Sequence, residues 1–291
     1  MPPSRQSVSV LAPAKINLFL RVLRLRPDGY HDIETIFQAI DLYDELVLEK
    51  ANGPSTIEVP GFPGLETDTN LVIQAHKWIE RHVRRSLSVR MRLAKRIPLA
   101  AGLGGGSSDA AAALVGLRAI FDLEISDDWL TRAAVTLGAD VPFFLQGGTA
   151  VGEGIGERLT PCDLPRDYGL ILLNPGIPVS TAKVFRELSA SLTPQGREGT
   201  VWKLLEDRRP WEDLLVNDLQ GVAERLHPEI TRVRKALEDA GVTRVLMTGS
   251  GPTVFGMVQP DGIEEVRRRV PSEWSFHYAR PVSGGVRIEG T

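Results

Sequence analysis

The sequence lacks the features that mark several classes of protein. It contains a single cysteine, Cys162, which excludes an intramolecular disulfide and a cysteine-based metal cluster. Its 34 basic and 37 acidic residues leave a net charge of −3, so it has no basic excess of the kind that binds nucleic acid or an anionic membrane surface. A partner of either kind is therefore not expected.

Long apolar segments are also missing. No run approaches the length of about 18 apolar residues that a membrane-spanning helix needs, and the first residues, Met1 to Gln6, lack the apolar centre of a signal peptide. What is present is an ordinary globular balance, with 42% hydrophobic and 24% charged residues over 291 positions. These properties predict a cytoplasmic protein with one large or two ordinary domains.

The most informative stretch is rich in glycine and leads into a predicted helix. Glycine tolerates positive φ and has no Cβ, so the backbone amides of such a loop can approach a ligand closely. Ser107, Ser108 and Asp109 suit a helix N-terminus, and the four alanines that follow favour helix. Free amides and the helix dipole both favour negative charge there, which predicts an anion site. The alternative is a flexible turn before a surface helix.

Two common phosphate loops do not match this stretch. The P-loop pattern requires lysine after its last glycine, and Gly106 is followed by Ser107. The dinucleotide pattern, read from Gly102 and Gly104, requires glycine at position 107. A third kind of phosphate loop is therefore expected.

Two charged residues stand where the local pattern is restricted. Apolar residues alternate through segment 7–25 as they do in a strand, which puts Lys15 and Asn17 on one face. Farther along the chain, Pro142 predicts extended backbone just before itself, so Asp140 would lie at a constrained corner. Without other evidence, Lys15 is an ordinary solvent-facing lysine, and Asp140 could equally be a turn or capping residue.

A turn at 27–29, Pro-Asp-Gly, delivers Tyr30 and His31 to a predicted strand over 33–42. An aromatic ring offers a stacking face, and a neighbouring imidazole has a donor and an acceptor that can read the edge of a base. A lone Tyr-His pair is more often structural, so the pattern alone leaves both interpretations open.

Together these blocks resemble the GHMP kinase family, which includes galactokinase, homoserine kinase and mevalonate kinase. The resemblance is carried by Pro13-Ala14-Lys15-Ile16-Asn17-Leu18, the glycine loop from Pro98 to Ser108, Gly138-Ala139-Asp140-Val141-Pro142 and Thr248-Gly249-Ser250-Gly251-Pro252-Thr253, in that order. It implies a two-domain α+β fold with the site between the domains. Residues 1–158 would form a domain like ribosomal protein S5 domain 2, and residues 159–291 a ferredoxin-like domain.

The resemblance also implies ATP as the phosphate donor, with Mg²⁺. The residues expected to hold ATP are Pro98, Leu99, Ala100, Ala101, Gly102, Leu103, Gly104, Gly105, Gly106, Ser107 and Ser108. Ser108 is further expected to contact the Mg²⁺, and Asn70 is a candidate for the adenine pocket. Asp109 departs from the small or amide residue that is common at its position in the family, and is expected to cap the helix. The second glycine loop, 248–253, is expected to lie against the site.

The acceptor side follows from the same resemblance. Asp140 would accept the proton of the acceptor alcohol, and Lys15 would keep Asp140 ionised. Gly29-Tyr30-His31 is similar to the element found in the branch of the family whose small-molecule substrate is linked to cytidine diphosphate. In that branch Tyr30 would stack on the cytosine, His31 would read its edge and Phe185 would face Tyr30 across the ring, with Asn17 also at the substrate.

Two other functions fit the fold that the resemblance implies. One is a kinase of homoserine, mevalonate or a sugar, against which Gly29-Tyr30-His31 argues, since those substrates have no base to stack. The other is a catalytically silent nucleotide-binding protein, against which the presence of Lys15 and Asp140 argues. The sequence makes no prediction of the oligomeric state.

Overall fold

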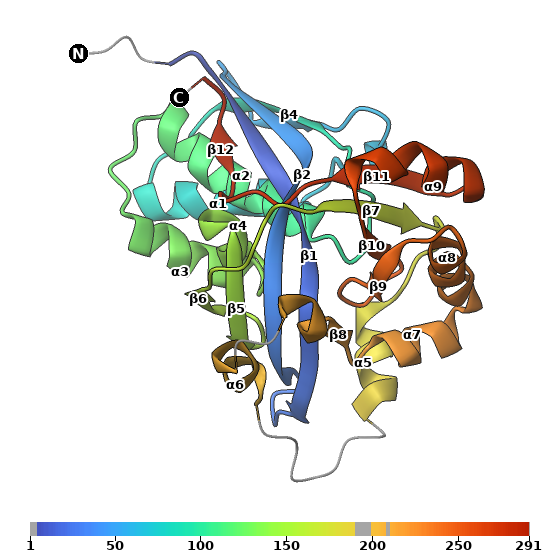
Figure 1. The fold of residues 1–291 in the computed structure, drawn as a ribbon. Coiled ribbons are helices and arrows are strands. Elements are labelled where there is room, and N and C mark those ends of the chain that lie inside the picture. The colour runs from blue at the N-terminus through green and yellow to red at the C-terminus, as the bar shows by residue number, and fades with distance from the viewer. Residues whose placement is uncertain (1–4, 190–198, 208–209, 291) are drawn as a thin grey trace.

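The computed structural model describes residues 5–189, 199–207 and 210–290. Two long strands, β1 (Ser7–Leu25) and β2 (His31–Lys50), run through the middle of the molecule (Figure 1). Both belong to the larger sheet; helices α1 to α4 lie to one side of them, and a smaller sheet with helices α5, α7, α8 and α9 lies to the other. Each sheet has its own buried apolar cluster, and a third cluster lies between them.

The alternation of apolar residues in segment 7–25 produces strand β1, as predicted. β1 pairs antiparallel with β2 along most of its length, and a register shift between Pro13 and Ala14 bends the pair just before Lys15. β2 continues beyond the expected strand to Lys50, because this shift absorbs the irregularity without ending the ladder.

The larger sheet has the strand order β12-β1-β2-β4-β3, with β5 on β2, β6 on β5 and β8 parallel to β1. The further strands of this sheet are β3 (Thr56–Glu58), β4 (Val89–Ala94), β5 (Thr149–Gly154), β6 (Arg158–Pro161), β8 (Val216–Asn217) and β12 (Arg287–Ile288). The expected division between residues 158 and 159 falls within β6, and β8 and β12 come from the second half of the chain.

Four helices cover one face of the larger sheet. They are α1 (Leu71–Val83), α2 (Gly105–Ile120), α3 (Asp127–Leu137) and α4 (Val141–Gln146), with a 3₁₀ turn η1 (Pro63–Leu65) before α1. The alanines after the glycine loop are fully buried in α2, which lets this helix lie close to the sheet. At Gly116 of α2 the approach is so close that a Cβ would meet Leu48 at 2.5 Å. The N-terminus of α2 is thereby fixed against β1 and β2.

The smaller sheet is antiparallel, with the order β11-β7-β10-β9. Its strands are β7 (Gly169–Asn174), β9 (Thr243–Met247), β10 (Val254–Val258) and β11 (Ser275–Ala279). The helices and turns of this part are α5 (Thr181–Ser189), α6 (Val201–Glu206), η2 (Trp211–Leu214), α7 (Gln220–Leu226), α8 (Pro228–Asp239), η3 (Pro260–Gly262) and α9 (Ile263–Arg269). The mixture of helix and antiparallel sheet in two parts is the α+β class that was expected.

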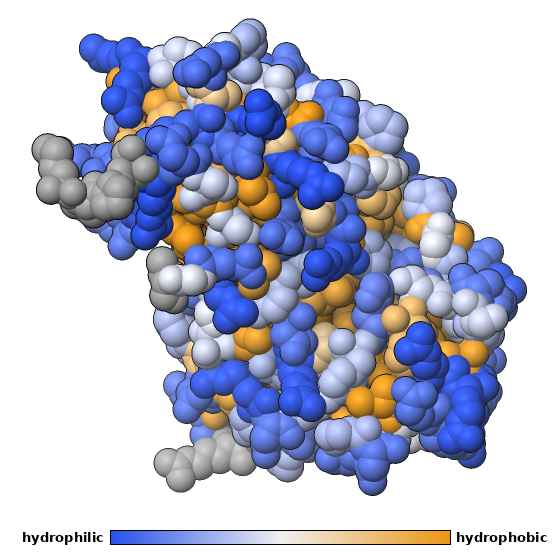
Figure 2. Space-filling view, turned by 90° about the horizontal axis from the view of Figure 1, so that it is seen from above, coloured by the Kyte–Doolittle hydropathy of each residue, from blue (hydrophilic) through white to orange (hydrophobic). Residues whose placement is uncertain are grey.

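The surface matches the composition. On the face shown in Figure 2, hydrophobic residues form separated patches within a mainly hydrophilic surface. Within the described residues, none of the helices has the length and apolar character needed to cross a membrane.

Candidate active site

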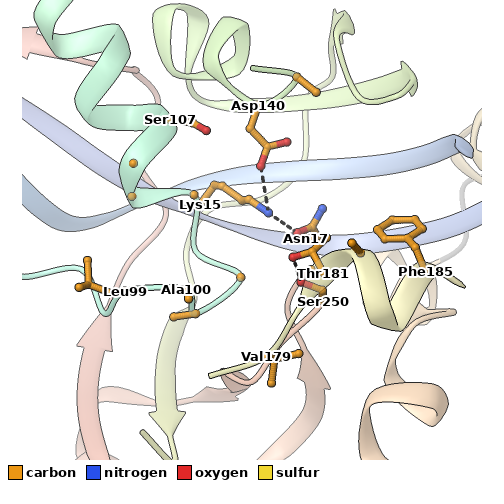
Figure 3. Close-up of a pocket in the computed structure, with 18 of the residues that line it drawn as sticks. Lys15, Asn17, Leu99, Ala100, Ser107, Asp140, Val179, Thr181, Phe185 and Ser250 are labelled. Atoms are coloured by element: carbon orange, nitrogen blue, oxygen red, sulfur yellow. Dashed lines mark hydrogen bonds and ion pairs between the residues drawn. The ribbon is translucent and has the colours of Figure 1, made fainter. Parts of the chain in front are cut away.

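One cavity collects nearly all the residues to which the sequence assigned a role. Its volume is about 1190 Å³, and it is lined from β1, the turn before β2, the start of α1, the glycine loop, the starts of α2 and α4, α5 and the second glycine loop (Figure 3). The predicted site residues on its wall are Lys15, Asn17, Tyr30, His31, Asn70, Pro98, Leu99, Ala100, Ala101, Gly102, Gly104, Gly105, Gly106, Ser107, Asp140 and Phe185.

The glycine loop ends at an uncapped helix N-terminus that faces this cavity. Gly104 is the N-cap of α2, with a φ of +71°, and no side chain caps the helix. A Cβ at Gly104 would come within 2.6 Å of the Phe144 ring, so both the backbone conformation and the space require glycine. The first-turn amides of Gly105, Gly106 and Ser107 have no acceptor within the helix, as at any helix N-terminus. The predicted anion site therefore has the geometry it needs.

The start of α2 differs from the prediction that Ser107, Ser108 and Asp109 form the N-terminus. The helix begins two residues earlier, at Gly105, because the left-handed conformation of Gly104 already turns the chain into the helix. The prediction that Asp109 caps the helix is also wrong. Asp109 lies beyond the first turn, is 3% exposed, and its carboxylate accepts a hydrogen bond from Lys95 Nζ at 2.6 Å.

The metal role expected for Ser108 is not supported either. Its side chain is fully buried, it does not line the cavity, and its Oγ has no hydrogen-bond partner among the described residues. Leu103 is likewise buried behind the cavity wall, although its carbonyl accepts a hydrogen bond from the Lys15 amide at 3.0 Å. Ser107, one position before Ser108 on the helix, lines the cavity instead.

The second glycine loop lies against the first, as expected. A Cβ at Gly102 would come within 2.3 Å of the Thr248 carbonyl oxygen, so glycine at this position is what allows the two loops to touch. Gly249 and Ser250 line the cavity. The Thr248 hydroxyl accepts a hydrogen bond from the backbone amide of Asn17 at 3.0 Å. This loop therefore connects the glycine loop to β1 beside the lysine.

Lys15 and Asp140 meet in the cavity from distant parts of the chain. Lys15 Nζ lies 3.8 Å from an Asp140 carboxylate oxygen and donates a hydrogen bond to Asn17 Oδ1 at 2.6 Å (Figure 3). Asn17 is held in turn by donating to the Thr35 hydroxyl at 2.8 Å. Since both polar ends of the Asn17 side chain are engaged in this way, Asn17 orients Lys15 at the cavity wall.

Burial sets the protonation behaviour of Lys15. Its side chain is 5% exposed, and loss of solvation lowers the pKa of Lys15 below the ordinary lysine value, while the neighbouring Asp140 raises it to a smaller extent. Asp140 is 34% exposed on the cavity side. One partner is therefore open to an incoming molecule, and the other is held behind it.

The local structure at Asp140 differs from the predicted extended corner. Asp140 is the N-cap of α4 with helical backbone angles, and Pro142 lies in the first turn of that helix. Amides in the first turn of a helix have no acceptor within the helix, so proline, which lacks an amide hydrogen, is tolerated there. Pro142 therefore stands at the start of a helix and does not force extended structure. The short helix fixes the direction from which the Asp140 carboxylate enters the cavity.

Phe185 on α5 packs against His31, with ring centroids 5.0 Å apart and an interplanar angle of 35°. A base stacked between two rings needs them roughly 7 Å apart, so no base lies between these two. The expected placement of Phe185 across the cytosine ring from Tyr30 stays a prediction, whereas its contact with His31 was not expected. The Tyr30 side chain lines the cavity and is 60% exposed. Burial lowers the pKa of His31, which favours a neutral imidazole with one donor and one acceptor nitrogen.

Asn70 lies at the opposite end of the cavity, where it caps α1. Its side chain accepts from the Val72 amide at 2.9 Å and donates to the Leu65 carbonyl at 2.9 Å. Leu65 and Leu71 line the cavity beside it. Asn70 therefore shapes an apolar end of the cavity through the helix start.

Sequence reasoning missed several residues of this site. The hydroxyls of Thr181 and Ser250 are 2.7 Å apart on the cavity wall (Figure 3), and Lys95 lines the cavity beside the start of α2. Thr181 and Ser250 lie in segments for which a helix start and a turn were sufficient explanations. Lys95 carried a detectable signal, since it follows a half-exposed strand directly before the glycine loop.

Comparison with known families agrees with this geometry. The model described as "GHMP kinases N terminal domain" matches residues 70–148, and the one described as "GHMP kinases C terminal" matches residues 201–275. A 4-diphosphocytidyl-2-C-methyl-D-erythritol kinase of Syntrophus aciditrophicus (strain SB) is 39% identical over 282 residues, which cover 94% of this chain and 99% of that protein. The chain belongs to the GHMP kinase family.

Further relatives that carry the same kinase name support this membership. The Geobacter metallireducens protein is 41% identical over 263 residues, which cover 90% of this chain and 92% of that protein. A crystal structure of 4-(cytidine 5'-diphospho)-2C-methyl-D-erythritol kinase has a TM-score of 0.77 and 36% identity, and covers 95% of this chain and 100% of that one. A homoserine kinase from Cytophaga hutchinsonii, with a TM-score of 0.75 and 17% identity over 99% of both chains, shares the fold.

The chain is thus a GHMP kinase with the expected two-domain α+β fold, and an ATP-dependent small-molecule kinase. The cavity fits ATP, since first-turn amides of α2 face it and glycine is required at Gly104 and Gly102. Within the part of the chain that the structure describes, no group of three His, Cys, Asp or Glu residues is placed to hold a metal ion.

Proposed function

We propose that this kinase phosphorylates a hydroxyl of 4-diphosphocytidyl-2-C-methyl-D-erythritol, in the non-mevalonate route to isoprenoid precursors. The observation that carries the proposal is the order of groups in one cavity. In Figure 3, Ser107 at the start of α2 lies to one side of the Lys15–Asp140 pair, and Phe185, whose ring contacts His31, lies to the other. Relatives that are about 40% identical over nearly the whole chain carry this name.

The donor end is built for a triphosphate. We assign the amides of Gly104 to Ser107 to the phosphates, and the apolar end around Leu65, Asn70 and Leu71 to the adenine ring. Ser108 was expected to contact Mg²⁺ but does not line the cavity, whereas its neighbour Ser107 does. We therefore assign the hydroxyl contact for Mg²⁺ to Ser107. Bound MgATP supplies the phosphoryl group.

The Lys15–Asp140 pair carries the chemistry. Asp140 accepts the proton of the acceptor hydroxyl while the new oxygen–phosphorus bond forms and ADP leaves, in a direct in-line transfer without a phosphoenzyme. Lys15 stabilises the ionised Asp140 and offsets negative charge that gathers on the transferred group. Asn17 holds the ammonium in place for both tasks.

The acceptor end is assigned to cytosine. One nitrogen of the neutral His31 imidazole would hydrogen-bond to the edge of cytosine, where the amino group is a donor and the ring nitrogen an acceptor. Because the His31–Phe185 contact leaves no room between these rings, the base would lie beside this pair of rings. The exposed Tyr30 ring would then close over the base.

Substrate choice tests the proposal. ADP release should be measured with 4-diphosphocytidyl-2-C-methyl-D-erythritol, homoserine and mevalonate as acceptors under the same conditions. Turnover is expected with the cytidine-linked alcohol alone, because neither of the others has a base for His31 and Phe185. Turnover with homoserine or mevalonate instead would replace the substrate assignment, and ATP binding without turnover of any acceptor would indicate a silent nucleotide-binding protein.

A further inference from the structure

A second buried lysine lies beside the glycine loop, close to Gly105, whereas Lys15 is close to Gly104. Lys95 follows β4, and its side chain is only 2% exposed. Its ammonium donates hydrogen bonds to two carboxylates, those of Asp44 on β2 and Asp109 on α2. None of these three residues has a role in the transfer described above.

Asp44 holds the entrance to the glycine loop. It is completely buried, and one of its oxygens accepts hydrogen bonds from the Arg96 amide at 2.5 Å and the Ile97 amide at 2.9 Å. Its other oxygen accepts from Lys95. The two residues that lead into the loop are thereby fixed to β2 in the centre of the larger sheet.

Asp109 holds the exit from the loop. One of its oxygens accepts from Lys95 Nζ at 2.6 Å, and it lies on α2 just after the first turn, whose amides face the cavity. Lys95 therefore joins the residue before the loop to the helix after it. The loop between them is closed at its base by a single ammonium.

The ammonium also lies directly under the start of the helix. A Cβ at Gly105 would come within 3.3 Å of Lys95 Nζ and 3.0 Å of Ile97 Cγ2. Both Lys95 and Asp109 line the cavity. The Lys95 ammonium is therefore close to the backbone of Gly105, at the first turn of α2.

We propose that Lys95, Asp44 and Asp109 form a positioning set for the glycine loop, which holds its amides at the spacing that the ATP phosphates require. The inference rests on the proposed function only in taking the phosphates as the ligand of these amides. The set acts through the loop and does not contact the acceptor. Its effect should therefore appear in the use of ATP and not in the use of the alcohol.

Charge favours positioning over simple stabilisation. The set has two buried carboxylates and one ammonium, and the second oxygen of Asp109 has no hydrogen-bond partner among the described residues. An apolar contact would stabilise the fold at least as well as such a buried ion pair. What the ion pair adds is a defined geometry, because two short hydrogen bonds fix the ammonium between β2 and α2.

The most informative variant is Asp109→Leu. It removes the connection between Lys95 and α2 but leaves the buried Lys95–Asp44 pair balanced in charge. We expect KM for ATP to rise about tenfold or more and KM for the acceptor to change less than about twofold. Asp109→Asn, which keeps an acceptor oxygen, should restore most of the affinity for ATP. The matched control is Asp127→Leu, which breaks the exposed ion pair between Asp127 and Arg118 of α2, and should leave both KM values unchanged.

Hydrogen exchange in the protein without substrates provides a second readout. In Asp109→Leu the amides of Gly102 to Ser107 should exchange faster, whereas those within α3 should keep the wild-type rate. If this variant does not fold, Asp109→Ala carries both measurements. Equal effects of the Leu and Asn variants, equal changes in both KM values, or unchanged exchange in the loop would overturn the inference. Failure of the proposed substrate is distinguishable, because it would show in the wild-type acceptor assay and leave the exchange result intact.

Discussion

Two lysines border the same glycine loop, and they are held in opposite ways. Lys15 has one partly exposed carboxylate at 3.8 Å, and burial lowers its pKa. Lys95 is also subject to burial, which by itself lowers its pKa, but Asp109 and Asp44 together raise the pKa above the ordinary value. A lysine with few partners is available to a substrate, whereas a lysine between two carboxylates is committed to the fold.

The difference shows how one loop is served by two kinds of charge. On the cavity side, Asn17 and the second glycine loop hold Lys15 without neutralising it. At the two ends of the loop, Asp44 and Asp109 accept from two of the three donors of the Lys95 ammonium. The first arrangement keeps charge for a reaction, and the second uses charge to set geometry.

The largest effect should come from breaking the reactive pair at its open end. Asp140→Asn keeps the shape of the side chain but removes its basicity, so we expect kcat to fall about 10²–10⁴-fold. ATP should still bind, because the amides of α2 are unchanged; single-turnover assays together with nucleotide titration measure both. Wild-type turnover in this variant would remove Asp140 from the role of base.

A smaller loss is expected from Lys15→Met. Removing the ammonium takes away charge stabilisation in the transfer, and we expect kcat to fall about 10²–10³-fold. KM for ATP should change far less than in Asp109→Leu, since the hydrogen bonds of Lys95 to Asp44 and Asp109 are kept. Steady-state kinetics of the two variants side by side would contradict the comparison if both altered KM for ATP to the same degree.

The smallest effect concerns the pH dependence of stability that Asp109, the partner of Lys95, produces. Burial, with a contribution from Asp44, raises the pKa of Asp109 to about 7, although Lys95 acts in the opposite direction. In the unfolded chain an aspartate titrates near about pH 4. The folded protein therefore holds this proton between the two values, and the stabilisation is complete below about pH 4 and is lost as the pH rises through about 7.

Asp109→Asn removes this titration, so its stability should depend less on pH in that window. The wild-type slope from this group is at most about 1.4 kcal/mol per pH unit, and urea unfolding at about pH 5 and about pH 8 measures it. Asp127→Asn is the matched control, because that carboxylate is 90% exposed and should leave the slope as it is. Equal slopes in wild type and Asp109→Asn would show that Asp109 does not hold the proton.

Local patterns predicted much of the reactive side. Alternation through segment 7–25 was sufficient for β1 and for placing Lys15 and Asn17 on one face, because side-chain direction in a strand depends only on the backbone. The glycine run was sufficient to predict a close backbone approach, which is found where a Cβ at Gly102 would meet the Thr248 carbonyl oxygen at 2.3 Å. The anion site itself stays a prediction. The family resemblance then named Asp140 as the partner of Lys15, and the two side chains do meet.

The supporting side could not be predicted in this way. Asp109 fits a cap from its neighbours alone, and only its contact with Lys95 across the loop shows otherwise. Asp44 reads as one more residue of a strand. Phe185 was expected opposite Tyr30, which stays a prediction, but the packing of α5 against His31 was not expected. Each of these depends on which segments lie side by side, and sequence spacing does not contain that information.

By itself, therefore, the sequence determined strand β1 and the close backbone approach at the glycine loop through local backbone preferences, and the order of its motifs indicated the class of fold through the family resemblance. Tertiary structure decided how each buried charge is used. The pKa of Lys15 falls and that of Lys95 rises because the first is buried beside one partly exposed carboxylate and the second is enclosed by two buried ones. The strength of a charge interaction depends on distance and burial, and only the folded chain sets these.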